Sequence, residues 1–81
     1  MLLIIKDNGA LRLCQDNKWR SFANFGTYPE CVKEYRSLGH ARRKAKRIKG
    51  EVVRIPVGVT VEAGGYAYDD NGKRELKEFV V

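Results

Sequence analysis

Few residues of this chain can perform acid–base, nucleophilic or metal chemistry. The sequence has one histidine, His40, and two cysteines, Cys14 and Cys31, and it contains no C-x-x-C pair. These residues cannot complete a zinc site by themselves, and no nucleophile stands with His40 at the spacing of a catalytic triad. We therefore expect no enzymatic activity, no metal and no cofactor.

Long apolar runs are missing as well. No stretch approaches the roughly 18 apolar residues that would indicate a membrane span, and the apolar start at Leu2–Ile5 has no basic region before it. We expect neither a membrane span nor a signal peptide, and hence a cytoplasmic protein. In a reducing cytosol, Cys14 and Cys31 could pair in principle but would more readily stay free and partly buried.

Two further patterns that could carry chemistry are better explained by turns. Asp69 and Asp70 could suggest a metal or an acid pair, but they directly precede Asn71-Gly72, which is typical of a turn. Gly64-Gly65 lacks the lysine and the strand-to-helix context of a phosphate-binding loop.

The composition indicates one folded domain covering residues 1–81. The chain has 81 residues, of which 43% are hydrophobic and 10% aromatic, so it is a folded protein rather than a disordered basic tail. We expect Trp19, Phe22 and Phe25 to belong to the core, whereas Tyr66 and Tyr68 share one face of a strand and could be buried or exposed.

Strand and turn signals predict an antiparallel sheet. The apolar segment Leu2–Lys6 is followed by Asp7–Gly9 ("DNG"), which favours a tight hairpin into "ALRLC", where Arg12 alternates with Leu11 and Leu13 as in a half-buried strand. A second "DNG" predicts another hairpin. Further strands are expected at "WRSF", "CVKEYR" (an early helical turn being the alternative), "EVVRI", "VTVEA" and "GYAY", with "ANFGTYPE" as a loop.

One helix is predicted between the segments "CVKEYR" and "EVVRI". Ser37 is a good N-cap, the helix runs to about Lys49, and Gly50 is suited to the C′ position. An apolar stripe of residues three or four positions apart follows this helix, and it consists of Leu38, Ala41, Ala45 and Ile48. We therefore predict an α+β fold, an antiparallel β-sheet of about five strands with a single α-helix packed on one face. The segment "EVVRI" is expected to be a central strand that Pro56 either ends or bulges.

The excess positive charge is concentrated on this helix. The chain has 16 basic and 10 acidic residues, and the helix and its cap hold six cations without an acid: Arg42, Arg43, Lys44, Lys46, Arg47 and Lys49. Like charges four positions apart repel each other, whereas an ordinary solvated face mixes glutamate with lysine. An acidic or polyanionic partner is the simplest reason for this pattern, and a role in solubility alone remains the alternative.

Three short segments carry a resemblance to a known family. They are "AKRI" at Ala45–Ile48, "GEVVRI" at Gly50–Ile55 and "AYDDNGKR" at Ala67–Arg74. In this order, from the helix end through the strand to the closing hairpin, residues 37–78 resemble one small phage-encoded anti-CRISPR family that acts on the type I-F surveillance complex.

The resemblance implies a five-stranded antiparallel sheet with one helix. It also implies binding to the backbone subunits of the RNA-guided complex, which blocks target pairing and can promote non-specific duplex binding. The basic contact pair of the family falls on Lys46 and Arg47, and its hairpin arginine falls on Arg74. Asp69 stands where the family has a contacting lysine, which leaves the CRISPR subtype open.

Two functions follow as hypotheses. The first is an anti-CRISPR inhibitor in the cytoplasm of an infected bacterium, with the backbone subunits of a type I surveillance complex as partner and double-stranded DNA or guide RNA as further partners. The second is a small basic nucleic-acid-binding protein of phage or bacterial origin that neutralises phosphates without reading sequence. The partner-binding residues expected are Arg42, Arg43, Lys46, Arg47, Lys49, Lys73 and Arg74.

Overall fold

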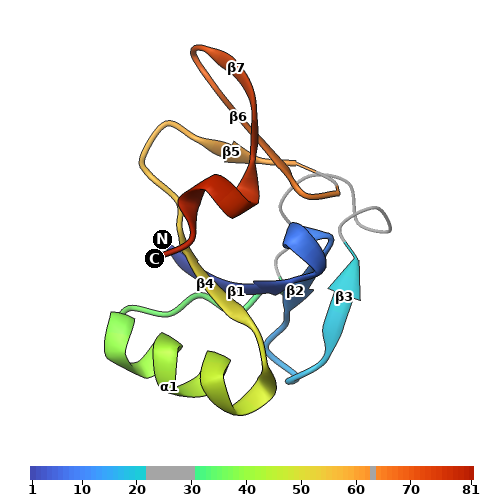
Figure 1. Cartoon of the computed structure of the whole chain (residues 1–81), viewed down its shortest axis with the longest axis vertical. Coiled ribbons are helices and arrows are strands. Elements are labelled where there is room, and N and C mark those ends of the chain that lie inside the picture. Colours follow the sequence, from blue (N-terminus) through green and yellow to red (C-terminus); the bar gives the residue numbers. More distant parts are fainter. Residues whose placement is uncertain (22–30, 63) are drawn as a thin grey trace.

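The chain folds into two antiparallel sheets and one α-helix in the computed structural model (Figure 1), which describes residues 1–21, 31–62 and 64–81. The predicted loop "ANFGTYPE" and the predicted core residues Phe22 and Phe25 lie outside these ranges. No helix in the described ranges is long and apolar enough to cross a membrane. The elements are β1 (Leu2–Lys6), β2 (Leu11–Leu13), β3 (Trp19–Ser21), α1 (Leu38–Ile48), β4 (Glu51–Arg54), β5 (Thr60–Val61), β6 (Tyr66–Asp69) and β7 (Gly72–Glu75), with 3-10 turns at Asp7–Gly9 and Leu76–Phe79.

The predicted α+β class is confirmed, but the strands form two sheets rather than one. The first sheet has four strands in the order β3-β2-β1-β4, and the second has three in the order β5-β6-β7. β4 ends at Arg54, two residues before Pro56, which cannot donate a ladder hydrogen bond. The chain therefore leaves the first sheet there and begins the second.

β1 is one of the two interior strands of the first sheet, whereas "EVVRI", which was predicted to be a central strand, forms β4 at the end of the strand order. Strand β1 pairs with β2 on one side and with β4 on the other, and its residues Leu2–Ile5 are buried on both faces. Leu2 and Ile4 pack in the core cluster with the helix, whereas Leu3 and Ile5 pack in the cluster with the second sheet. Burial on both faces explains why this strand reads as a continuous apolar run.

Helix α1 covers one face of the first sheet through the predicted stripe. Ala41 and Ala45 are buried, and Leu38 and Ile48 pack partly buried against the same cluster. The Ser37 hydroxyl accepts a hydrogen bond from the His40 amide at 3.3 Å, which confirms the N-cap.

The end of the helix differs from the prediction. Lys49, not Gly50, takes the left-handed conformation, with φ 61°, and the Gly50 amide donates to the Ala45 carbonyl at 2.8 Å. Gly50 is needed for close packing instead, because a Cβ there would lie 2.6 Å from Ile4 Cγ2.

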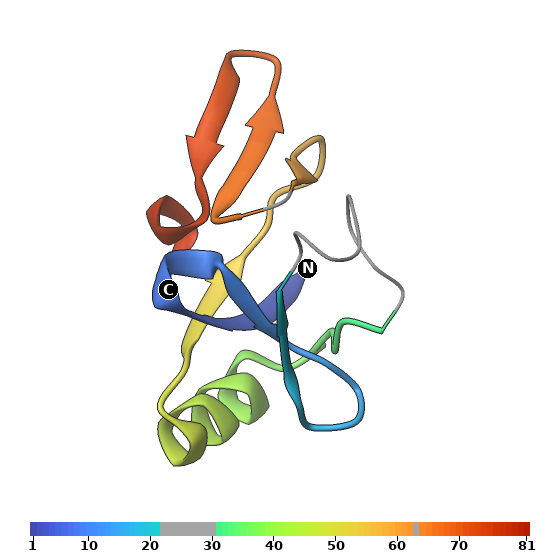
Figure 2. The same cartoon turned by 90° about the vertical axis from the view of Figure 1, so that its right-hand side faces the viewer.

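Both "DNG" triplets form hairpins as predicted, with different geometry. In the first, Asp7, Asn8 and Gly9 all have positive φ in a 3-10 turn between β1 and β2. In the second, a carboxylate oxygen of Asp69 accepts a hydrogen bond from the Asn71 amide at 2.8 Å, and only Gly72 has positive φ. The second hairpin, β6–β7, projects from the end of the molecule opposite the helix (Figure 2).

The segment Cys31–Arg36 is not the regular strand that we favoured. It makes isolated bridges, Val32 with Cys14 and Tyr35 with Leu2. Its Lys33 amide donates to the Leu13 carbonyl of β2 at 3.0 Å, and its Tyr35 amide donates to the Leu2 carbonyl of β1 at 2.9 Å. The segment thus crosses from one strand to the next, so it cannot build a continuous ladder with either.

Arg12 is fully buried, which corrects its predicted place on a half-buried strand. Its guanidinium Nη2 donates to the Glu62 carbonyl at 2.9 Å and to the Gly64 carbonyl at 3.1 Å. These carbonyls lie in the connection from β5 to β6, whereas Arg12 belongs to β2. The side chain therefore links the two sheets through charge-assisted hydrogen bonds.

The substitution Arg12→Met should lower the free energy of unfolding by about 3 kcal/mol, because two partly buried carbonyls lose a charged donor while the side chain keeps a similar size. Urea denaturation measures this value. Arg54→Met removes an exposed arginine from β4 and should change stability by less than about 0.5 kcal/mol. Equal effects of the two substitutions would contradict the linking role of Arg12.

Candidate functional site

An open groove of about 610 Å³ lies between helix α1 and residues Lys33–Arg36 of the segment Cys31–Arg36, which is called the crossing segment below. Ser37, between the two, caps the helix, so the chain turns directly from one wall of the groove into the other. Its lining consists of Asn17, Lys33, Glu34, Tyr35, Arg36, His40, Arg43, Lys44 and Arg47.

The groove is strongly cationic. Among these lining residues, five are cationic and Glu34 is the single carboxylate. Three of the cations come from the helix, Arg43, Lys44 and Arg47, and two come from the opposite wall, Lys33 and Arg36. Charges from two separate segments therefore converge on one hollow.

The helix cations have no carboxylate partner within the described part of the chain. The ion pairs there join Arg20 to Asp16, Arg74 to Asp69 and Glu78, and Lys77 to Glu75. None of these pairs involves α1 or its cap. The charge that the sequence concentrates on the helix therefore stays unneutralised by described residues of the same fold.

The helix divides its predicted contact residues between two sides. Arg43 and Arg47 line the groove, whereas Arg42 and Lys46 line a smaller hollow of about 280 Å³ with Val80 and Val81. Lys49 is exposed at the left-handed cap. Lys46 and Arg47, the pair carried over from the family resemblance, are both exposed but face different hollows.

The two predicted contact residues of the hairpin lie far from the helix. Lys73 and Arg74 belong to β7, at the opposite end of the molecule in both views (Figures 1 and 2). The Lys73 ammonium lies 3.8 Å from the centre of the Tyr66 ring, a cation–π contact. Tyr66 and Tyr68 are both exposed on this hairpin. The structure does not bring Lys73 and Arg74 together with the other predicted site residues.

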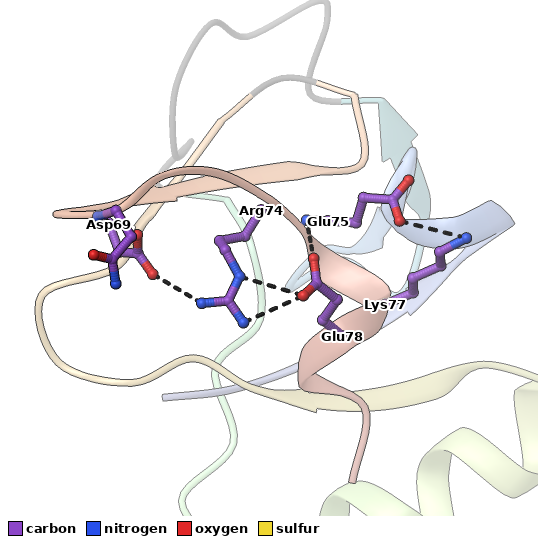
Figure 3. A network of polar contacts seen from close by, with 6 residues as sticks. Asp69, Arg74, Glu75, Lys77 and Glu78 are labelled. Atoms are coloured by element: carbon purple, nitrogen blue, oxygen red, sulfur yellow. Dashed lines mark hydrogen bonds and ion pairs between the residues drawn. The ribbon is translucent and has the colours of Figure 1, made fainter.

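Arg74 already has carboxylate partners (Figure 3). Its guanidinium lies 3.1 Å from an oxygen of Asp69 and 3.2 Å from an oxygen of Glu78. These hydrogen bonds, that of Glu78 first, raise the pKa of Arg74, while the backbone amide of Glu75 is the main cause that lowers the pKa of Glu78. Asp69, where the family has a lysine, thus serves here as a partner of Arg74.

Sequence reasoning missed the second wall of the groove. The sequence pattern predicts Lys33, Tyr35 and Arg36 to be part of a strand, and it assigns Lys44 to the charged helix without predicting it as a contact residue. The Lys33 ammonium lies 5.6 Å from the centre of the half-buried Tyr35 ring, and burial raises the pKa of Tyr35 while the charge of Arg47 opposes that shift. The basic–aromatic spacing of "KEYR" was the available signal, but only the fold places it beside the helix.

The described residues contain no cluster of three or more histidine, cysteine or acidic side chains that could hold a metal ion. The Asp69 carboxylate bonds to the Asn71 amide, as expected for a residue that starts a turn. Comparison of the chain with protein-family models, with curated proteins and with solved structures gave no match.

Replacing Arg43→Glu should raise the free energy of unfolding by about 0.5–1 kcal/mol, because the substitution turns repulsion with Arg47 into an attractive i,i+4 pair. Arg43→Gln removes only the repulsion and should give about half the gain. Thermal or urea denaturation at low salt measures both, and 1 M salt should reduce the difference. A loss of stability in both variants would show that Arg43 has a compensating partner.

Proposed function

We propose that this protein binds the phosphate backbone of nucleic acid in the cationic groove. The observation that supports it is the convergence of cations from α1 and from Lys33–Arg36 on one open hollow, without carboxylate partners for the helix cations among the described residues. A polyanion relieves the mutual repulsion of Arg43 and Arg47, and arginine matches phosphate with two parallel hydrogen bonds.

The groove favours a duplex over a single strand. Single-strand binders stack bases on exposed aromatic rings, but Tyr35, the aromatic residue of the described lining, is half-buried. The exposed Tyr66 and Tyr68 stand on the distant hairpin. Reading of base edges has little support, because Asn17 is the one amide side chain in the described lining. Binding is therefore directed to the backbone and independent of sequence.

The isolated protein should bind duplex DNA with a steep salt dependence. If all five groove cations contact phosphates, affinity falls about 500-fold between 50 and 200 mM salt, from a slope of about −0.9 per neutralised phosphate. The double variant Arg43→Ala/Arg47→Ala should reduce that slope by about 2. Fluorescence anisotropy with a labelled duplex of arbitrary sequence measures both quantities.

The matched control is Lys73→Ala/Lys77→Ala, which removes two exposed charges outside the groove, one on β7 and one on the 3-10 turn that follows it. It should leave the slope unchanged. The proposal fails if the unmodified protein does not bind duplex at 50 mM salt, or if the control loses as much affinity as the helix variant.

A second, narrower function is inhibition of a type I CRISPR surveillance complex in the cytoplasm of an infected bacterium. Two observations favour it: helix, strand β4 and the β6–β7 hairpin follow one another in the order that the family resemblance requires, and Lys46 and Arg47 are exposed. Because Arg74 is matched by Asp69 and Glu78, the contact with the backbone subunits rests on the helix. The helix would meet acidic side chains or the backbone of the guide or target.

A purified type I surveillance complex should co-elute with the protein in size-exclusion chromatography. The variant Lys46→Glu/Arg47→Glu should lose this co-elution while keeping its circular dichroism and its melting temperature within a few degrees. Lys73→Glu/Lys77→Glu makes the same charge change outside the helix, on β7 and the 3-10 turn after it, and should still co-elute. If the protein co-elutes with none of the type I complexes, this second function is excluded and the duplex-binding proposal still stands.

A further inference from the structure

The two cysteines of the chain meet where the crossing segment begins. Cys14 follows β2, Cys31 begins the crossing segment, and their Sγ atoms lie 3.3 Å apart although the residues are 17 positions apart in the sequence. Both are free thiols in the structure. A disulfide has a bond length of about 2.05 Å, so the sulfurs need to approach by little more than about 1 Å.

The backbone around the pair is already aligned. The Gln15 amide donates to the Cys31 carbonyl at 2.8 Å, and Cys14 forms an antiparallel bridge with Val32. Hydrogen bonds thus hold the two segments side by side on both sides of the sulfurs. A disulfide here would join two segments that backbone hydrogen bonds already hold next to each other.

The two thiols differ in access. Cys14 is 1% exposed and its Sγ lies 3.9 Å from the Arg12 carbonyl, whereas Cys31 is only partly buried. Burial, followed by the contact with Cys31, raises the pKa of Cys14 to about 12, so this thiol is rarely ionised. Cys31 is therefore the sulfur that reacts first with a reagent from solvent.

We propose that Cys14 and Cys31 are a reversible thiol–disulfide site that takes a small-molecule disulfide, such as glutathione disulfide, and fixes one wall of the groove. The Cys31 thiolate attacks the small disulfide, which forms a mixed disulfide and releases one small thiol. The Cys14 sulfur then attacks Cys31, its proton passes to the departing thiolate, and the second small thiol leaves. Two cysteine thiols are oxidised and one small disulfide is reduced to two thiols.

The bridge acts on the groove through the crossing segment. Lys33, Tyr35 and Arg36 follow Cys31 within five positions and form the wall opposite the helix. In the reduced protein this wall is attached to the sheet by hydrogen bonds such as those of the Lys33 and Tyr35 amides. The disulfide adds a covalent attachment at Cys31, the first residue of the crossing segment. Only the consequence for nucleic-acid affinity rests on the proposed function.

The site is tested by incubating the full chain with glutathione disulfide and then with excess reduced glutathione. After each step the free thiols are alkylated and the protein is analysed by mass spectrometry. The unmodified protein should form an internal disulfide and return to two alkylated thiols on reduction. Cys14→Ser should accumulate a glutathione adduct at Cys31, and Cys31→Ser should stay unmodified. A stable adduct on the unmodified protein, a disulfide-linked dimer or persistence of both thiols would overturn the proposal.

Hydrogen exchange of the oxidised and reduced protein tests the effect on the wall. The Lys33 and Tyr35 amides should exchange at least about 30-fold more slowly when the bridge is present, which corresponds to the low end of typical disulfide stabilisation. The Gly50 amide, which bonds to the Ala45 carbonyl at the end of helix α1, is the internal control and should change little. Equal exchange of Lys33 and Tyr35 in both states would show that the bridge does not fix the wall.

Duplex affinity of the two states separates this inference from the proposed function. The oxidised protein should bind a labelled duplex about three- to tenfold more tightly, because the ordering of the wall no longer opposes binding, and with an unchanged salt slope. If the bridge forms and slows exchange while neither state binds duplex at 50 mM salt, the thiol–disulfide site stands and the nucleic-acid proposal fails. Equal affinities would overturn the regulatory effect.

Discussion

The structure depends on the burial of strand β1 on both of its faces. One face receives the apolar stripe of helix α1, and the other receives the second sheet together with the 3-10 turn at Leu76–Phe79. Because the helix must turn Ala41 and Ala45 inward to cover Leu2 and Ile4, its charged residues can only point outward or sideways. The hydrophobic contact that makes the core therefore also creates the cationic surface.

The same constraint explains why the two ends of the molecule differ electrostatically. At the hairpin end the charges are arranged in pairs, with Arg74 held between Asp69 and Glu78, as expected for a small projecting element that gains from local ion pairs. At the helix end the described cations gather around a groove without such partners. This contrast between the two ends is the basis of the proposal that the helix charge meets a partner outside the molecule.

The two walls of the groove are attached to the rest of the fold in different ways. Helix α1 is fixed by its core stripe and by the Ser37 cap, whereas the Lys33–Arg36 wall is held by a few hydrogen bonds to β1 and β2. The cysteine pair stands at the start of that second wall. In the proposed site, a chemical change of two buried or half-buried sulfurs would act on the groove wall without altering any of the residues that line the groove.

Local signals in the sequence determined the helix from Ser37, its apolar stripe, both "DNG" hairpins and the concentration of cations, because each depends on residues only a few positions apart. The tertiary structure alone decided what depends on distant partners. Arg12 reads as a surface residue and is buried, since its acceptors lie some fifty positions away at Glu62 and Gly64. In the same way, the Lys33–Arg36 wall and the meeting of Cys14 with Cys31 arise only when the crossing segment passes over the ends of β1 and β2.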